Sequence, residues 1–126
     1  MSLEATEAEC AAAAAAKGHK PRVSLNDIKA AMASVYYVTG DQAVGFHVRK
    51  SPSLSVLTIC IVVMQNGFVI IGKSAPASEA NFDVALGRKL AYGDCVRQIW
   101  PLMGFALRDK LSNHVGEDPV YPRPAA

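Results

Sequence analysis

The segment from Asn81 to Leu111 constrains the fold most, because it is the longest stretch with a helical period. Pro101 interrupts this pattern, since proline lacks a backbone N–H and crowds the preceding turn. The apolar residues recur mostly at steps of three or four, which predicts an amphipathic helix that buries one face. They are Phe82, Leu86, Leu90, Val96, Ile99, Trp100, Met103, Leu107 and Leu111.

The two ends of this segment can be predicted from cap chemistry and from proline. Three cap-type residues, Ser78, Asn81 and Asp83, favour a helix start here. Their side-chain oxygens can accept from the free N–H groups of a first turn. Pro101 predicts a break or kink near Ile99, followed by a second short helix. Trp100 is expected to be largely buried where the two helical pieces meet the sheet.

Gly87 and Gly93 interrupt this helix, where each glycine costs about 1 kcal/mol relative to alanine. The simpler interpretation is close packing of another element against that helix face. A functional interpretation is that Gly87 leaves the backbone beside Arg88 open to a ligand.

A β-hairpin is predicted between residues 54 and 73. The run Leu54–Met64 is apolar and rich in β-branched residues, which is typical of a strand covered on both faces. Asn66-Gly67 then predicts a two-residue turn, because a type I′ turn needs two residues with positive φ. Phe68–Lys73 returns as the second strand.

The remaining elements complete an α+β fold. Ser24 and Asp27 form a capping-box pattern, which predicts a helix ending near Ser34. Val35–Val38 and Ala43–Arg49 are expected to be short strands. The chain is therefore predicted to have an N-terminal helix and a small antiparallel sheet with a central β-hairpin. A kinked C-terminal helix packs on this sheet.

Composition sets the domain boundaries and disfavours several kinds of site. A single domain is expected over residues 23–112, between an Ala-rich tail at 1–22 and a Pro-rich tail at 113–126. A net charge of +2 gives no general case for nucleic-acid binding. The three scattered cysteines argue against a disulfide framework, and His19, His47 and His114 have no metal-ligand spacing. No metal site, catalytic residue or cofactor is predicted.

No export or membrane signal is expected. Glu4, Glu7 and Glu9 stand where a signal peptide needs positive charge. The apolar run Leu54–Met64 is too short to span a bilayer as a helix. These features, together with the cysteines, favour a cytoplasmic protein.

One group of side chains is a candidate ligand site. Arg88 and Tyr92 are four residues apart and share a helix face, and Lys73 ends the second predicted strand. A guanidinium beside an aromatic ring suits a phosphate-bearing ligand, with the ring under a base. The alternative is a solvated helix face in which Asp94 and Arg97 form a weak ion pair.

Several short motifs lie close together between residues 57 and 111. They are Leu57-Thr58-Ile59-Cys60, Asn66-Gly67-Phe68, Gly72-Lys73-Ser74-Ala75, Asn81-Phe82-Asp83, Gly87-Arg88-Lys89-Leu90-Ala91, Ile99-Trp100-Pro101-Leu102 and Gly104-Phe105-Ala106-Leu107. This pattern resembles a family of small tailed-phage and prophage proteins of unknown function. The resemblance implies a phage or prophage gene acting in the cytoplasm of a bacterial host. It supplies no catalytic residues.

Three functions are compatible with these observations. The first is a non-enzymatic binding protein that grips a host protein or sequesters a small nucleotide signal used in anti-phage defence. The second is a small nuclease or hydrolase, and the third is a nucleic-acid-binding accessory protein. The first is favoured, because the sequence carries no signature of a catalytic site.

A homo-oligomer, most simply a homodimer, is also predicted. One amphipathic helix covers only one face of a small sheet, whereas Leu54–Met64 is apolar on both. A second subunit is the expected cover for the other face.

Overall fold

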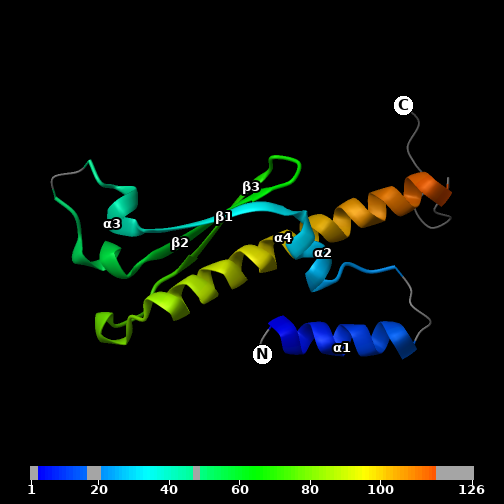
Figure 1. The fold of residues 1–126 in the computed structure, drawn as a ribbon, viewed down its shortest axis with the longest axis horizontal. Coiled ribbons are helices and arrows are strands. Elements are labelled where there is room, and N and C mark those ends of the chain that lie inside the picture. Colours follow the sequence, from blue (N-terminus) through cyan, green and yellow to red (C-terminus); the bar gives the residue numbers. More distant parts are fainter. Residues whose placement is uncertain (1–2, 17–20, 47–48, 116–126) are drawn as a thin grey trace.

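Strand β2 (Thr58–Met64) is the centre of the fold and pairs antiparallel with a strand on each side. Its neighbours are β1 (Met32–Thr39) and β3 (Val69–Ser74). Helix α4 (Val84–Val115) lies along one face of this sheet, as Figure 1 shows. The computed structural model describes residues 3–16, 21–46 and 49–115. This arrangement confirms the predicted α+β class.

The core lies between α4 and the sheet, with a contribution from α2 (Leu25–Ala31). Alternate residues of β2 point toward α4, as the period of two in a strand requires. Cys60 and Val62 are fully buried there, and they meet Val96 and Ile99 of the helix. Ile28 of α2 closes the end of this core.

Two glycines set the distance between the helix and the sheet. A Cβ on Gly72 of β3 would overlap the carbonyl oxygen of Ala91 and lie 2.7 Å from the Cys95 sulfur. A Cβ on Gly87 of α4 would lie 2.6 Å from the Thr58 hydroxyl oxygen. Gly87 is therefore a close-packing position, which confirms the simpler of its two interpretations.

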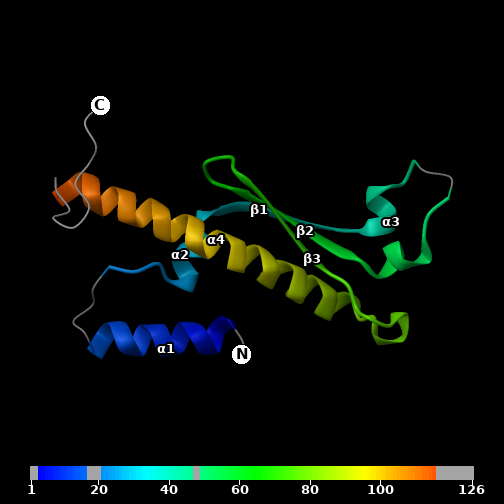
Figure 2. The ribbon, with the colours of Figure 1, turned by 180° about the vertical axis from the view of Figure 1, so that it is seen from behind.

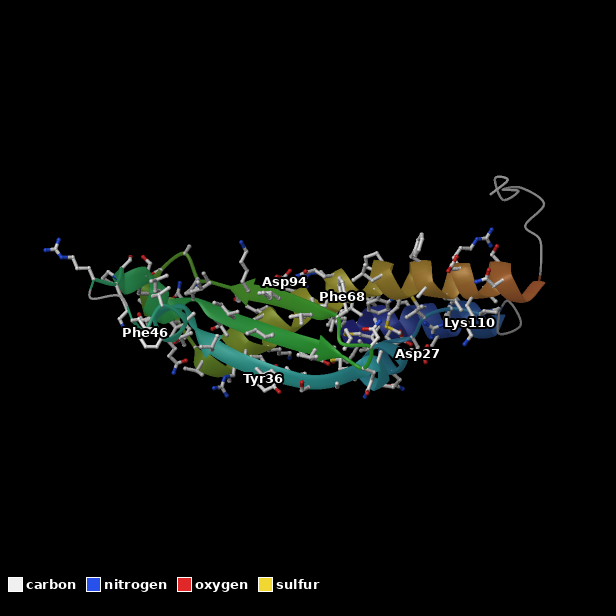
Figure 3. The ribbon with its side chains drawn as sticks, turned by 90° about the horizontal axis from the view of Figure 1, so that it is seen from above. Asp27, Tyr36, Phe46, Phe68, Asp94 and Lys110 are labelled. Carbon is white, nitrogen blue, oxygen red and sulfur yellow. The ribbon has the colours of Figure 1, made fainter. Side chains whose placement is uncertain are left out.

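The other face of the sheet is open, as the view in Figure 3 shows. Tyr36 is 57% exposed, Val69 50% and Ile71 59%, and Ile61 and Val63 are half-buried between them. No described element covers these side chains. Within the described chain, α4 therefore covers one face of β2, and the predicted cover of the other face is not seen.

The predicted β-hairpin is confirmed, but its turn is one residue longer than expected. Gly67 donates its N–H to the Met64 carbonyl, and Met64 donates to the Phe68 carbonyl. The loop therefore holds Gln65, Asn66 and Gly67, and Gly67 takes a φ of 87°. A three-residue loop needs positive φ at its last residue, which glycine adopts without strain.

Helix α2 begins as predicted, with a capping box between Ser24 and Asp27. The helix ends at Ala31 rather than near Ser34, because Met32 is already extended and starts β1. The predicted strand Val35–Val38 is therefore the middle of a longer strand.

The strand predicted at Ala43–Arg49 is wrong where the structure describes it. Residues 40–43 form the short helix α3 (Gly40–Ala43), followed by a turn to residue 46. Thr39 donates its N–H to the Gln42 side chain and its hydroxyl to Asp41, and these bonds favour a helical turn. Residues 47 and 48 lie outside the described chain.

The strand predicted from Leu54 begins at Thr58. Residues Pro52–Val56 form a 3₁₀ turn, since Ser51 caps it through its hydroxyl and Pro52 occupies its first position. Ser55 also donates its hydroxyl to the Pro52 carbonyl. Local hydrogen bonds thus outweigh the β preference of Leu54 and Val56.

Helix α4 is not broken at Pro101 and runs on to Val115. Pro101 removes a hydrogen bond to the Arg97 carbonyl, but both residues are exposed, so solvent can reach the side of the helix where that bond is lost. The separate second helix predicted from Pro101 is therefore wrong. Trp100 is half-buried and borders a hollow beside α1 (Leu3–Ala16), not the junction of two helical pieces.

Helix α1 lies on the side of α4 away from the sheet, as Figure 2 shows from behind. Glu7 accepts from the Arg22 guanidinium at 2.8 Å and from the Leu25 N–H at 3.0 Å. These bonds tie α1 to the entry of α2. The Pro-rich residues 116–126 lie outside the described chain, so the predicted tail stays a prediction.

Candidate functional site

The described chain has an apolar groove of about 430 Å³. It lies between the β2–β3 turn and the second half of α4. Its described lining comprises eight apolar residues and two amides: Ala31, Met64, Gln65, Asn66, Phe68, Ile70, Ile99, Leu102, Met103 and Ala106. We call this feature the hairpin groove.

The hairpin groove has a buried floor and an exposed apolar rim. Ile99 and Ile70 are buried at its floor, where they belong to the core. Phe68 on the turn is 55% exposed and Leu102 on the helix 47%. Figure 3 shows Phe68 at the end of the hairpin, above α4. None of the ten lining residues is charged, so the groove suits an apolar ligand surface.

The helix continues past the groove with further exposed apolar residues. Phe105, one residue before the lining Ala106, is 75% exposed. An exposed aromatic side chain next to an apolar groove is typical of a protein-binding surface.

The predicted Arg88 site is built differently from the sequence prediction. The Arg88 guanidinium carbon lies 5.4 Å from the ring centroid of Tyr37 on β1, within cation–π range. These two residues border a hollow of about 40 Å³ with Thr39, Gln42 and Thr58. A hollow this small holds little more than one water molecule, so a larger ligand would lie over its mouth.

Lys73 is not brought together with Arg88. Gly72 faces α4, and Lys73, its neighbour on β3, therefore projects to the opposite face of the sheet. Lys73 pairs with Ile59, and β2 separates it from the strand that carries Tyr37. Of the three predicted residues, Arg88 and Tyr92 therefore share one face of α4, and Lys73 lies apart from them on β3.

Tyr92 is half-buried and contributes to packing. Its hydroxyl lies 3.7 Å from the Met32 sulfur. Burial raises the pKa of Tyr92 and that of Tyr37 above the ordinary tyrosine value. Both phenols are therefore neutral at physiological pH, so they offer ring faces and hydroxyl hydrogen bonds but no charge.

Cys60 and Cys95 are buried opposite each other at the helix–sheet contact. The Cys95 thiol donates to the Cys60 carbonyl at 3.5 Å. Burial raises the pKa of the Cys95 thiol to about 12. Such a thiol is a core residue rather than a nucleophile.

Asp94 and Arg97 form the expected i, i+3 ion pair, at 3.9 Å. Asp94 has a second partner, since one of its oxygens accepts from the Lys73 N–H at 3.0 Å. This carboxylate therefore fixes the helix to the edge of β3.

Within residues 3–16, 21–46 and 49–115, no group of three His, Cys, Asp or Glu is placed to hold a metal ion. No described helix is both long and apolar enough to cross a membrane. His19 and His47 lie outside the described residues, as does the side chain of His114.

Residues 23–111 match the model of the phage protein (N4 Gp49/phage Sf6 gene 66) family. The chain belongs to this family. The match spans α2, the three strands and most of α4, so the hairpin groove and Arg88 both lie within the family region. No curated protein and no solved structure matches the chain.

Family membership confirms the resemblance drawn from the sequence motifs and supports a phage-encoded protein. The hairpin groove was missed at the sequence level. Phe68 belongs to the predicted second strand and Leu102 to the predicted C-terminal helix, and only tertiary packing brings these two elements together. Tyr37 was missed for the same reason, because it lies 51 positions before Arg88 in the sequence.

Proposed function

We propose that this phage-encoded protein is a non-enzymatic binding protein that acts in the cytoplasm of the host bacterium. Its partner is a host protein that presents an apolar segment, such as the apolar face of a helix, to the hairpin groove. A phage product that occupies such a surface would alter a host process, including a defence process.

The apolar, uncharged lining of the hairpin groove carries this proposal. A nucleotide needs a cation for its phosphate, whereas the ten lining residues offer only the amides of Gln65 and Asn66 as polar groups. A helix binds such a groove through residues spaced at i, i+3, i+4 and i+7. Phe68 and Leu102 then act as the exposed walls that close around it.

Capture from host lysate tests the proposal when two matched variants are included. Leu102→Asp puts a charge into the groove wall. Leu86→Asp puts the same charge on the same helix outside the groove, at a similar exposure of 50% against 47%. The parent and Leu86→Asp are expected to capture the same host protein, identified by mass spectrometry, and Leu102→Asp is expected to lose it. Equal capture by both variants would exclude the groove as the binding surface.

A second candidate function is the binding of a small nucleotide signal at Arg88. The observation that favours it is the Arg88 guanidinium over the Tyr37 ring, which pairs a cation with an aromatic face. Tyr92 lies on the same helix face, while Lys73 would contribute only from the other side of the sheet.

Calorimetry with mononucleotides and cyclic dinucleotides tests this second candidate. Arg88→Ala is expected to abolish the heat of binding, whereas Arg97→Ala, another exposed arginine of α4, is expected to keep it. No heat with the parent protein, or equal affinity in Arg88→Ala, would leave Arg88 as a surface charge.

A further inference from the structure

The two outer edges of the sheet differ in what covers them. On β3, the Lys73 N–H donates to Asp94 and the Ile71 carbonyl accepts from the Gln98 amide at 2.8 Å. Both partners are side chains of α4. Figure 3 shows Asp94 beside the β3 edge of the sheet. Two of the outward hydrogen-bonding groups of this edge are therefore occupied by the protein itself.

The outward groups of β1 can be assigned from the strand register. The Ile71 carbonyl and the Lys73 N–H point away from β2. Their partners on β2, Ile61 and Ile59, therefore direct their own backbone N–H and carbonyl groups toward β1. Those two residues face Tyr36 and Val38. The intervening β1 residues, Val35 and Tyr37, must direct their N–H and carbonyl groups away from the sheet.

At its centre the β1 edge is bare in the described part of the chain, whereas the Thr39 N–H at its end donates to the Gln42 side chain. No described residue forms a hydrogen bond with the outward backbone groups of Val35 or Tyr37. Val35 and Tyr37 are each 37% exposed. Figure 3 shows Tyr36 on the outer strand at this edge. The open stretch of this edge around Val35–Tyr37 is a template for pairing with another strand.

The composition of β1 favours a second copy of the same strand. Its sequence, Met32–Thr39, has no charged side chain and no proline. Sheet edges that avoid self-pairing usually carry one or the other. When a strand pairs antiparallel with its own copy, like residues lie opposite each other near the two-fold axis. A neutral strand makes that arrangement free of charge repulsion.

We propose that two copies of the protein pair through the β1 edge to form a dimer with a continuous six-stranded antiparallel sheet. Val35 of one copy exchanges both backbone hydrogen bonds with Tyr37 of the other. Tyr36 then lies on the two-fold axis, opposite its counterpart on the open face. This inference is independent of the hairpin groove, and stacking of the open faces is the competing arrangement.

Two lysine variants distinguish these arrangements in the full-length protein. Tyr36→Lys puts two like charges on the proposed two-fold axis. Ile71→Lys puts one charge on the same open face, at a similar exposure, but on the covered β3 edge. Neither side chain is buried, so both variants should keep the melting temperature of the parent.

Sedimentation or light scattering between about 1 and 100 µM provides the measurement. The parent is expected to be a dimer. Tyr36→Lys should raise its dissociation constant about tenfold or more, and Ile71→Lys should leave it within about twofold. A monomeric parent would overturn the proposal. So would equal weakening by both variants, which indicates face stacking, or weakening by neither.

Disulfide formation gives a second readout if Tyr36→Lys fails to fold. In a Cys10→Ser background, Tyr36→Cys should give a covalent dimer on mild oxidation, because residues opposite each other in such a pair are within disulfide reach. Ile71→Cys should stay monomeric on a denaturing gel. Equal cross-linking of the two variants would contradict edge pairing.

Discussion

Gly72 of β3 lies directly against Ala91 of α4, with no room for a side chain between the strand and the helix. A Cβ at Gly72 would overlap the Ala91 carbonyl oxygen and lie 2.9 Å from the Cys95 nitrogen, both of them backbone atoms. The helix therefore has to move as a whole to accept even a methyl group.

Gly72→Ala is accordingly expected to lower the free energy of unfolding by about 1–3 kcal/mol, the usual cost of overpacking a core. Gly104→Ala is the matched control, because a Cβ there meets nothing within 4 Å. In the helix interior it should raise stability by up to about 1 kcal/mol. Urea denaturation of both variants makes the comparison, and a neutral Gly72→Ala would show that the helix is not held this close.

Ile99 and Trp100 are neighbours on α4 with different roles in packing. Ile99 is fully buried, so Ile99→Ala should cost about 2–5 kcal/mol. Trp100 is half-buried beside α1, and Trp100→Ala should cost less than Ile99→Ala despite removing more atoms. Thermal melting of the two variants tests this order, and the reverse order would place Trp100 in the main core.

The docking of α1 should depend on pH through Glu7. The Arg22 guanidinium, which hydrogen-bonds to Glu7, lowers the pKa of that carboxyl below its ordinary value of 4.5. A carboxyl whose pKa is lower in the folded than in the unfolded state stabilises the folded state at a pH above its ordinary pKa. This stabilisation is lost as the pH falls through the pKa of the folded state. Acid should therefore release α1 before the core unfolds.

Fluorescence of Trp100, the single tryptophan, reports this release because its hollow is bordered by Thr6 and Cys10 of α1. The parent and Glu9→Gln should show an acid-induced change in emission at low pH. Glu7→Gln should show the released signal already at neutral pH. An identical pH profile for Glu7→Gln and the parent would mean that Glu7 does not hold α1.

The three thiols should react at very different rates. Cys10 is exposed, whereas Cys60 and Cys95 are buried and the pKa of Cys95 is raised to about 12. A thiol reagent at mildly alkaline pH should modify Cys10 alone in the native protein and all three in urea. Rapid modification of Cys95 in the native state, seen by peptide mass spectrometry, would contradict its buried placement.

The parts of the fold that depend on local chemistry could be predicted from the sequence. The capping box of Ser24 and Asp27 fixes the start of α2 within four residues of chain. Asp83 accepts from the Leu86 N–H and so caps α4 as expected. The hairpin was predicted because its strands flank a single glycine-containing turn, although the length of that turn and the start of the first strand were wrong.

The features that depend on solvent exposure or on packing between distant residues could not be predicted from the sequence. Pro101 was expected to break α4, but whether water satisfies the Arg97 carbonyl depends on which side of the helix faces the sheet. The partner of Arg88 is Tyr37 on β1 rather than a residue of its own helix. The hairpin groove likewise exists only because the turn at Phe68 lies over Leu102, and no sequence pattern gives that crossing.

The affinity of the captured host protein for two α4 variants tests the proposed binding function most directly. Calorimetry with the purified partner should give a dissociation constant for Leu86→Asp within about twofold of the parent value. For Leu102→Asp it should be about tenfold higher or more, since a charge in an apolar groove loses its hydration on binding. Equal dissociation constants for Leu102→Asp and the parent would contradict binding through the hairpin groove.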